Sequence, residues 1–217
     1  MEILYEDSSV IVCIKPQGVL SQADKNGGES MITRLETYTG GEIFPVHRLD
    51  KETGGVMVYA KTKSAAAALS LDISEHRFTK EYLALVHGVP ERKSDTLCDL
   101  LFHDRAKNKS YVVKRERKGV KKAELEYELL YTKEKDGEEY SLLRVKLHTG
   151  RTHQIRVQFA HRKMPLAGDK KYGAQDGFSS LGLWAYKLDF INPETHKNTE
   201  FTALPQNYIS DYFMHLK

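Results

Sequence analysis

The chain has 217 residues, of which 40% are hydrophobic and 29% are charged, and its formal net charge is only +3. A chain of this length fits one domain with a proper buried core, and its composition is that of an ordinary globular protein. Because the net charge is small, a nucleic-acid site must come from local clustering of basic residues.

Cysteine spacing and hydropathy indicate the cellular compartment in which the protein is expected to act. The two cysteines, Cys13 and Cys98, lie far apart and lack the spacing of a metal or redox motif, which predicts inert thiols in a reducing compartment. The first ten residues do not resemble a signal peptide, and no apolar run approaches the roughly 18 residues that span a bilayer. We therefore expect a cytoplasmic protein that does not enter a membrane.

The first forty or so residues predict two strands and a helix. Segments 3–5 and 10–15 have the pattern of strands, and the turn-forming residues 7–9 join them. After Ser30, apolar residues recur at helical spacing up to the Gly40–Gly41 pair, which predicts a helix between these two points.

The most informative stretch covers residues 47–61 and reads HRLDKETGGVMVYAK. It places Asp50 two residues after Arg48 and shortly before the Gly54–Gly55 pair, and a strand-like run follows. Glycines beside a polar acid would let a large substrate approach the backbone at the lip of a buried strand. The same residues also suit a solvated loop with an ion pair, and composition alone leaves both interpretations open.

Two regular elements are expected after this stretch. Ser64 can cap a helix that continues through an alanine run to about Glu75. Residues 80–88 read KEYLALVHG and have apolar side chains on both faces of a strand, with Tyr82 on one of them. This pattern indicates an interior strand that is covered on both sides.

Residues 103–122 form a basic segment with a short strand signal at residues 111–113. The segment suits a solvated hairpin at a sheet edge, where lysines discourage unwanted pairing. It equally suits an arm that contacts nucleic-acid phosphates, and for that role we single out Lys114, Arg115 and Arg117. Against two acids, Asp104 and Glu116, the segment has nine basic residues: Arg105, Lys107, Lys109, Lys114, Arg115, Arg117, Lys118, Lys121 and Lys122.

The next segments predict a strand pair and a helix. Residues 124–130 and 140–147 read as strands around the Asp136–Gly137 turn. Thr152 can cap a helix that ends near Pro165 and Gly168.

Three basic side chains, Arg151, His153 and Arg156, lie at the start of that predicted helix. The free N–H groups and the dipole of a helix N-terminus already favour an anion there. A closing strand around residues 184–190 and a short helix from Tyr208 to Leu216 complete the expected elements.

Several chemistries have no support in the sequence. We find no phosphate-binding glycine loop, no Gly-x-Ser-x-Gly elbow and no histidine spacing that suits a metal, so we expect neither a cofactor nor a metal. What remains is a single acid flanked by cations, a strand tyrosine and an arginine near a helix start. An aspartate kept ionised by a guanidinium can attack an electrophilic carbon without a metal, provided that the geometry compensates for desolvation.

Three ordered motifs carry a resemblance to the RluA-type family of RNA pseudouridine synthases. The segment from His47 to Lys61 resembles the family's signature motif, and Lys80, Tyr82, Ala84 and Gly88 resemble its second motif. The third motif is matched by residues 150–156, which read GRTHQIR, followed by Pro165, Gly168-Asp169 and Tyr172-Gly173. Lys15-Pro16 with Gly18, and Lys122-Ala123, also fall where the family has similar patterns.

The resemblance implies a role for each matched residue. Asp50 would be the catalytic aspartate that attacks the uridine, at either the ring or the sugar carbon. Tyr82 would lie against the uracil face and help to remove the C5 proton, and Arg156 would pair with Asp50. Arg48 would fill the gap left by the flipped nucleotide, because a base inside structured RNA must be extruded before it can react. His47, Arg151 and His153 would contribute to RNA binding.

Two residues depart from the family pattern. Gly54 stands where the family usually has serine, and Gln158 stands where histidine is common. We also expect the protein to lack the S4-like N-terminal domain that many relatives carry, so RNA affinity would come from the catalytic domain and its basic segment.

The expected protein is therefore a single α+β catalytic domain over residues 1–217. Its mixed, mostly antiparallel sheet would form two lobes with a central cleft lined by Asp50 and Tyr82. The expected partner is transfer or ribosomal RNA, with no obligatory protein partner and a monomeric state. The alternatives are an RNA-binding or chaperone module without catalysis and a hydrolase that uses Asp50.

Overall fold

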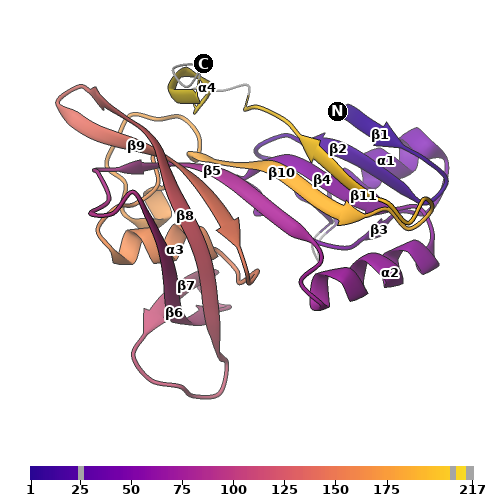
Figure 1. The fold of residues 1–217 in the computed structure, drawn as a ribbon, viewed down its shortest axis with the longest axis horizontal. Coiled ribbons are helices and arrows are strands. Elements are labelled where there is room, and N and C mark those ends of the chain that lie inside the picture. Colours follow the sequence, from indigo (N-terminus) through magenta and orange to yellow (C-terminus); the bar gives the residue numbers. More distant parts are fainter. Residues whose placement is uncertain (24–26, 206–208, 214–217) are drawn as a thin grey trace. The chain divides into compact units, whose positions relative to one another are not determined.

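The structure is a computed structural model that describes residues 1–23, 27–205 and 209–213 (Figure 1). The chain divides into two compact units that we describe in turn. Unit 1 consists of Met1–Lys80 and Ala185–Leu204, and unit 2 consists of Glu81–Trp184 and Pro205–Lys217. Whether residues 1–217 act as one catalytic domain stays a prediction.

Unit 1 contains a sheet with the strand order β1-β2-β4-β10, in which β3 also pairs with β4 and β11 with β10. The pairs β1/β2, β2/β4, β3/β4 and β10/β11 are antiparallel. Every residue of β4 is buried, which agrees with its central place in this order. The strands are β1 (Glu2–Glu6), β2 (Val10–Lys15), β3 (Phe44–Pro45), β4 (Gly54–Ala60), β10 (Leu183–Ile191, whose first two residues belong to unit 2) and β11 (Asn198–Thr202).

The described residues of unit 1 include the helices α1 (Met31–Thr39) and α2 (Lys63–Ser74). Helix α1 begins and ends as predicted, with Ser30 at its N-cap and Gly40 in the left-handed conformation at its C-terminus. Helix α2 begins earlier than predicted. Its N-cap is Thr62, whose Oγ1 accepts the Ala65 N–H at 3.1 Å, so the assignment of the cap to Ser64 is wrong.

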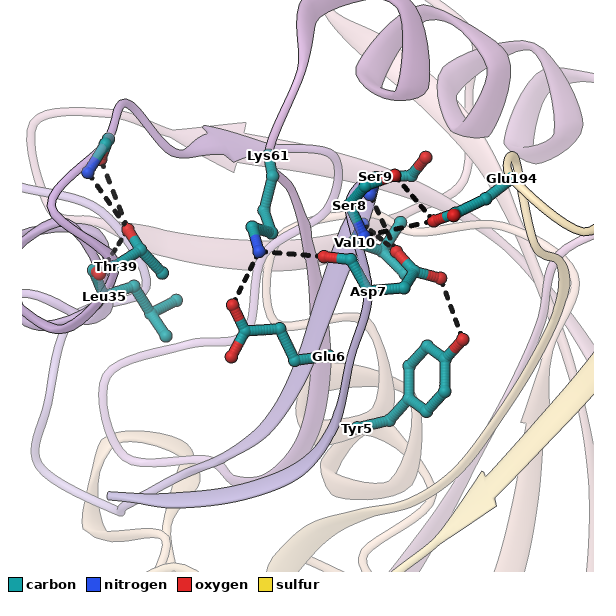
Figure 2. A network of polar contacts seen from close by, with 11 residues as sticks. Tyr5, Glu6, Asp7, Ser8, Ser9, Val10, Leu35, Thr39, Lys61 and Glu194 are labelled. Atoms are coloured by element: carbon teal, nitrogen blue, oxygen red, sulfur yellow. Dashed lines mark hydrogen bonds and ion pairs between the residues drawn. The ribbon is translucent and has the colours of Figure 1, made fainter.

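A polar network ties together the ends of several strands of unit 1 (Figure 2). The Lys61 ammonium donates to the Glu6 carboxylate at 2.6 Å and to the Asp7 carbonyl at 2.8 Å. The Asp7 carboxylate caps the β1–β2 turn, since it accepts the N–H groups of Ser9 and Val10. The turn predicted at residues 7–9 is thereby confirmed, and Lys61 holds it beside the end of β4.

Unit 2 contains a sheet with the strand order β5-β9-β8-β6-β7, in which all neighbours are antiparallel. The β8–β9 hairpin turns at Asp136 and Gly137, both with positive φ, as the sequence predicted. Strand β6 was not predicted. The strands are β5 (Thr79–His87, whose first two residues belong to unit 1), β6 (Ser94–Asp104), β7 (Lys109–Val113), β8 (Val120–Lys135) and β9 (Glu138–Leu147).

The helical elements of unit 2 are α3 (Gln154–His161), the 3-10 turn η1 (Lys170–Tyr172) and α4 (Ile209–Phe213). The cap predicted at Thr152 is wrong, because α3 begins after His153, which is left-handed with φ 55° and makes no side-chain cap. Helix α3 also ends before the expected Pro165. The predicted C-terminal helix is confirmed for residues 209–213, while Tyr208 and residues 214–216 lie outside the described residues.

The fold is α+β with a mostly antiparallel sheet, as the sequence predicted. The core of unit 1 packs the inner faces of its strands against α2, through residues that include Val12, Val58, Leu69 and Phe190. Within the described ranges no helix has the length and apolar character that crossing a membrane requires.

Candidate active site

The loop that carries Asp50 is fixed to unit 1 through its neighbour Leu49, which is buried. The Leu49 N–H donates to Ser21 Oγ at 3.0 Å, and Ser21 Oγ donates to the Leu49 carbonyl at 2.9 Å. The Tyr59 hydroxyl of β4 in turn donates to the Ser21 carbonyl at 3.0 Å. This arrangement holds the backbone next to Asp50 against the buried central strand.

Lys15, at the end of β2, is fully buried and supports the same loop from the other side. Its ammonium donates to three backbone carbonyls: those of Pro16 (3.0 Å), Val19 (2.6 Å) and Lys51 (3.1 Å). Burial lowers the pKa of Lys15 to about 8, and the negative charges of Glu52 and Asp50 oppose this decrease. The sequence motif contained Lys15, but its role as a backbone clamp was missed because it depends on the path of the chain.

The two residues before Leu49 occupy different environments. Arg48 is exposed, as its predicted contact with RNA requires. His47 instead turns inward: its Nε2 accepts the Val58 N–H at 3.2 Å, and its ring lies 5.4 Å from that of Phe78. Burial lowers the pKa of His47 to about 3, so its ring is neutral at pH 7. These contacts are structural, and RNA binding by His47 stays a prediction.

The glycine pair after Asp50 also serves packing. Gly55 has φ +125°, and a Cβ on it would lie 2.2 Å from the Ala185 carbonyl oxygen of β10. Neighbouring protein backbone therefore occupies the space where a Cβ would lie, and clearance for a substrate at this glycine stays a prediction. Gly54 is buried at the start of β4, and nothing in the structure explains why it replaces the family's serine.

Tyr82 lies in β5 of unit 2, where it is 6% exposed and sits opposite Val145 of β9. The end of β5 is also joined to the segment that follows α3. The Ala167 N–H donates to the Leu85 carbonyl at 2.8 Å, and the His87 N–H donates to the Pro165 carbonyl at 3.0 Å. Tyr82 thus stands on a strand that is held on a second side by the loop leading to Asp169.

Arg156 lies in the first turn of α3 and forms a buried, two-pronged ion pair with Asp169. Its Nε is 2.7 Å from Asp169 Oδ2 and its Nη2 is 2.8 Å from Oδ1, with side chains 5% and 0% exposed. This geometry orients the guanidinium plane firmly. The expected pairing of Arg156 with Asp50 stays a prediction. Asp169 was missed as a partner, although it follows Gly168 in the third motif.

Gln158, the second departure from the family pattern, has a structural explanation. Its Nε2 donates to the Leu97 carbonyl at 3.2 Å and to the Asp99 carboxylate at 2.8 Å, which holds α3 against β6. Arg162, one turn later, pairs with the same carboxylate at 2.8 Å. An amide at position 158 therefore suits the neighbouring acid.

A loop anchored on Asp176 positions Asp169. The Asp176 carboxylate accepts the Gly168 N–H at 2.9 Å and lies 2.7 Å from His87 Nε2. Gly168 has φ +72°, and a Cβ there would lie 2.0 Å from the Ser180 carbonyl oxygen. Only glycine fits this close approach, which sets the residue before Asp169 and so the direction of its carboxylate.

Tyr172 links the Arg156–Asp169 pair to β7. Its ring centroid is 5.2 Å from the Arg156 guanidinium, and its hydroxyl accepts the Ser110 N–H at 2.8 Å. The same hydroxyl lies 2.9 Å from His153 Nδ1. Burial raises the pKa of Tyr172 to about 12 and lowers the pKa of His153 to about 4, the latter with help from nearby cations. Since His153 is only 6% exposed, its predicted RNA contact stays a prediction.

The three basic residues singled out in the 103–122 segment belong to unit 2 and are exposed. Lys114, Arg115 and Arg117 belong to the β7–β8 loop (residues 114–119), at the far end of the β6–β7–β8 arm in Figure 1. Beside the arm is an open pocket of about 690 Å³ that includes Arg151. It is lined by Leu101, Phe102, His103, Asp104, Arg105, Ser110, Gly119, Lys121, Gly150, Arg151 and Thr152.

The structure thus brings Tyr82 and Arg156 into unit 2, while Asp50 belongs to unit 1. The meeting of these three residues stays a prediction. Among the described residues, no group of three or more His, Cys, Asp or Glu side chains could hold a metal ion. Both cysteines are free, and burial raises the pKa of Cys13 to about 12, as expected of an inert thiol.

Comparisons with known proteins give a consistent result. The sequence matches the RNA pseudouridylate synthase family over residues 9–161, which include Asp50, Tyr82 and Arg156. Ribosomal large subunit pseudouridine synthase D of Borreliella burgdorferi is 36% identical over 221 residues, which cover 95% of this chain and 66% of that protein. tRNA pseudouridine synthase C of Pasteurella multocida is 31% identical, and the match covers 94% of this chain and 90% of that protein.

A solved structure with the same fold is that of Human RNA Pseudouridylate Synthase Domain Containing 1, with a TM-score of 0.78 and 24% identity. The match covers 94% of this chain and 83% of that one. Because the family match spans most of the sequence and includes all three motifs' central residues, the chain belongs to the RNA pseudouridylate synthase family.

Proposed function

We propose that this chain isomerises uridine to pseudouridine in structured RNA. The bond between uracil N1 and ribose C1′ is broken, the base turns, and a bond forms between C5 and C1′. The proton released from C5 is matched by one taken up at N1, so the reaction consumes no oxidant or reductant. The observation that carries the proposal is the family match over residues 9–161, with Asp50, Tyr82 and Arg156 in their motifs.

In this proposal Asp50 is the nucleophile, at either the ring carbon or the sugar carbon of the target uridine. Its loop is clamped at Leu49 and Lys51, which suits a carboxylate that must meet one carbon atom. Arg156 holds Asp50 ionised, and Asp169 keeps the guanidinium in one orientation for that task. Tyr82 lies against the flipped base, where a buried ring favours stacking.

The RNA is held by cations that are exposed or partly exposed. We assign the phosphate contacts to Lys114, Arg115 and Arg117 of the β7–β8 loop and to Arg151 at the adjacent pocket. Arg48 fills the gap that the flipped nucleotide leaves in the stack. His47 and His153 also belong to the proposed RNA-binding residues, and each has an internal partner that orients its ring.

The substrate is a transfer or a ribosomal RNA in the cytoplasm, and the protein acts as a monomer. The names of the relatives include both substrate classes, since one is a ribosomal large subunit pseudouridine synthase and another is a tRNA pseudouridine synthase. Mapping pseudouridines in total RNA from cells with and without the gene identifies the RNA and the position.

The Asp50→Asn variant tests the proposal. It removes the nucleophile without changing the shape of the side chain, so pseudouridine formation should fall at least about a thousandfold while RNA affinity is largely kept. Glu52→Gln is the matched control, because it makes the same change at an exposed acid two residues away and should leave the rate near that of the wild type. Undiminished modification by Asp50→Asn would overturn the assignment.

RNA that contains 5-fluorouridine separates the synthase from its rivals. Fluorine at C5 blocks the final proton loss, so a synthase should accumulate a stalled complex. Release of free 5-fluorouracil by the wild type would indicate a hydrolase. Binding without a stalled complex, together with no isomerisation of ordinary uridine in the same RNA, would indicate an RNA-binding module.

A further inference from the structure

We infer that Tyr172 is a positioning residue that couples strand β7, which leads into the β7–β8 loop, to the Arg156–Asp169 pair. The inference rests on the proposed function, since it assigns RNA contacts to that loop and a catalytic role to Arg156. It goes beyond that function because it names a residue that touches neither the target base nor Asp50 in the proposed mechanism.

The ring and the hydroxyl of Tyr172 have different partners. The ring faces two cations, with the Arg156 guanidinium 5.2 Å and the Lys109 ammonium 5.1 Å from its centroid. A cation at this distance is attracted to the ring, and the attraction is larger where water is excluded. Arg156 is 4% exposed, so the ring helps to orient a guanidinium that Asp169 binds through Nε and Nη2.

The hydroxyl of Tyr172 holds β7, which lies at the end of the strand order in unit 2. It accepts the N–H of Ser110, a residue that is 2% exposed, at 2.8 Å. The same oxygen lies 2.9 Å from His153 Nδ1, within hydrogen-bond distance. One oxygen thus joins an edge strand to the residue before α3.

Ser110 strengthens the same junction. Its Oγ donates to the Thr152 carbonyl at 2.6 Å, and His103 Nδ1 lies 3.2 Å from that Oγ. The connection also continues along the chain, since the Tyr172 N–H donates to the Asp169 carbonyl at 3.0 Å. Loss of the Tyr172 hydroxyl would leave a buried N–H on β7 without its acceptor, which is unfavourable enough to displace an edge strand.

This geometry predicts that the two parts of the side chain affect different kinetic constants. Tyr172→Phe keeps the ring over Arg156 but releases β7, so KM for RNA should rise about tenfold while kcat changes less than about twofold. Tyr172→Leu also removes the ring, so kcat should fall by a further factor of about ten or more. Ser110→Ala removes the Oγ contacts with Thr152 and His103 but keeps the N–H that Tyr172 accepts, so it should raise KM by about threefold.

Tyr111→Phe is the matched control, because it removes a hydroxyl from an exposed tyrosine of β7 whose ring also lies near Lys109. The kcat and the KM of this variant should equal those of the wild type. The inference is wrong if Tyr172→Phe leaves KM unchanged, or if the Phe and Leu variants share one kcat. An inactive wild type would instead refute the proposed function, so the two failures are distinct.

Discussion

The two parts of the candidate active site are held in different ways. In unit 1, the loop of Asp50 is fixed through its backbone, by Ser21 at Leu49 and by Lys15 at Lys51. In unit 2, Arg156 is fixed through its side chain, by the two oxygens of Asp169 and by the Tyr172 ring.

The difference follows from the two side chains. An aspartate is short, so holding the backbone on both sides of it also limits where its carboxylate can reach. An arginine is long and flexible, so its helix alone cannot orient the guanidinium and a carboxylate must do so. The proposed nucleophile is thus positioned through the backbone on both sides of it, whereas its proposed counter-ion is positioned through its side chain by a dedicated partner.

The largest effect is expected from Arg156→Ala. It removes the proposed counter-ion of Asp50 and strands the fully buried Asp169, so kcat should fall about a thousandfold and stability by about 3–5 kcal/mol, with a modest change in RNA affinity. Single-turnover kinetics and urea unfolding measure the two effects. The matched control is Arg162→Ala, because Arg162 caps the C-terminus of the same helix and its ion pair with Asp99 of β6 is partly exposed.

A double variant separates the two consequences of losing Arg156. Replacing the pair with Arg156→Met and Asp169→Leu should restore most of the stability, because no buried charge remains, and should leave the activity low. Near-normal turnover in either variant would show that Arg156 is not the counter-ion of Asp50.

The next effect concerns the exposed cations of the β7–β8 loop. Replacing Lys114, Arg115 and Arg117 with glutamate should weaken RNA binding about a hundredfold at low salt. It should also reduce the slope of log Kd against log salt concentration by about 2–3. The control reverses three exposed lysines elsewhere, Lys63, Lys93 and Lys197. Equal losses in both triple variants would mean that the β7–β8 loop has no special role.

A smaller effect is expected from Lys15→Met, which tests the backbone clamp. Three carbonyls lose a charged donor, so stability should fall by about 1–3 kcal/mol and kcat by about tenfold, at unchanged RNA affinity. Lys61→Met provides the comparison, because Lys61 also binds a backbone carbonyl but holds the β1–β2 turn. It should lower stability without lowering kcat, and a shared loss of kcat would argue against a specific clamp on the Asp50 loop.

The smallest effect is on pH dependence in unit 2. The pKa of His153 is lowered to about 4 in the folded protein, from an ordinary value near 6.5, so the unfolded chain binds more protons between these values. Stability should therefore decrease by about 1–2 kcal/mol as the pH falls from 6.5 towards 4. His153→Asn, which tolerates the left-handed backbone, should reduce this slope, whereas exposed His161→Asn should not.

The elements that the sequence predicted well have local signals. Helix α1 is bounded by the Ser30 cap and Gly40, and the β8–β9 turn is set by Asp136 and Gly137. Strands β6 and β11 were missed, because their sequences carry no clear alternation and their neighbours β8 and β10 supply their hydrogen bonds. The cap of α2 moved from Ser64 to Thr62, since two nearby hydroxyls compete and only the backbone conformation selects one.

The sequence by itself determined the motifs that name Asp50, Tyr82 and Arg156, and with them the family, because each motif lies within a few consecutive residues. Only the tertiary structure revealed how the last of these is held. Arg156 meets Asp169 thirteen residues later, and Lys15 meets the carbonyl of Lys51 thirty-six residues later. Such contacts depend on where the chain folds back on itself, and the burial that makes them strong arises only when the core closes around them.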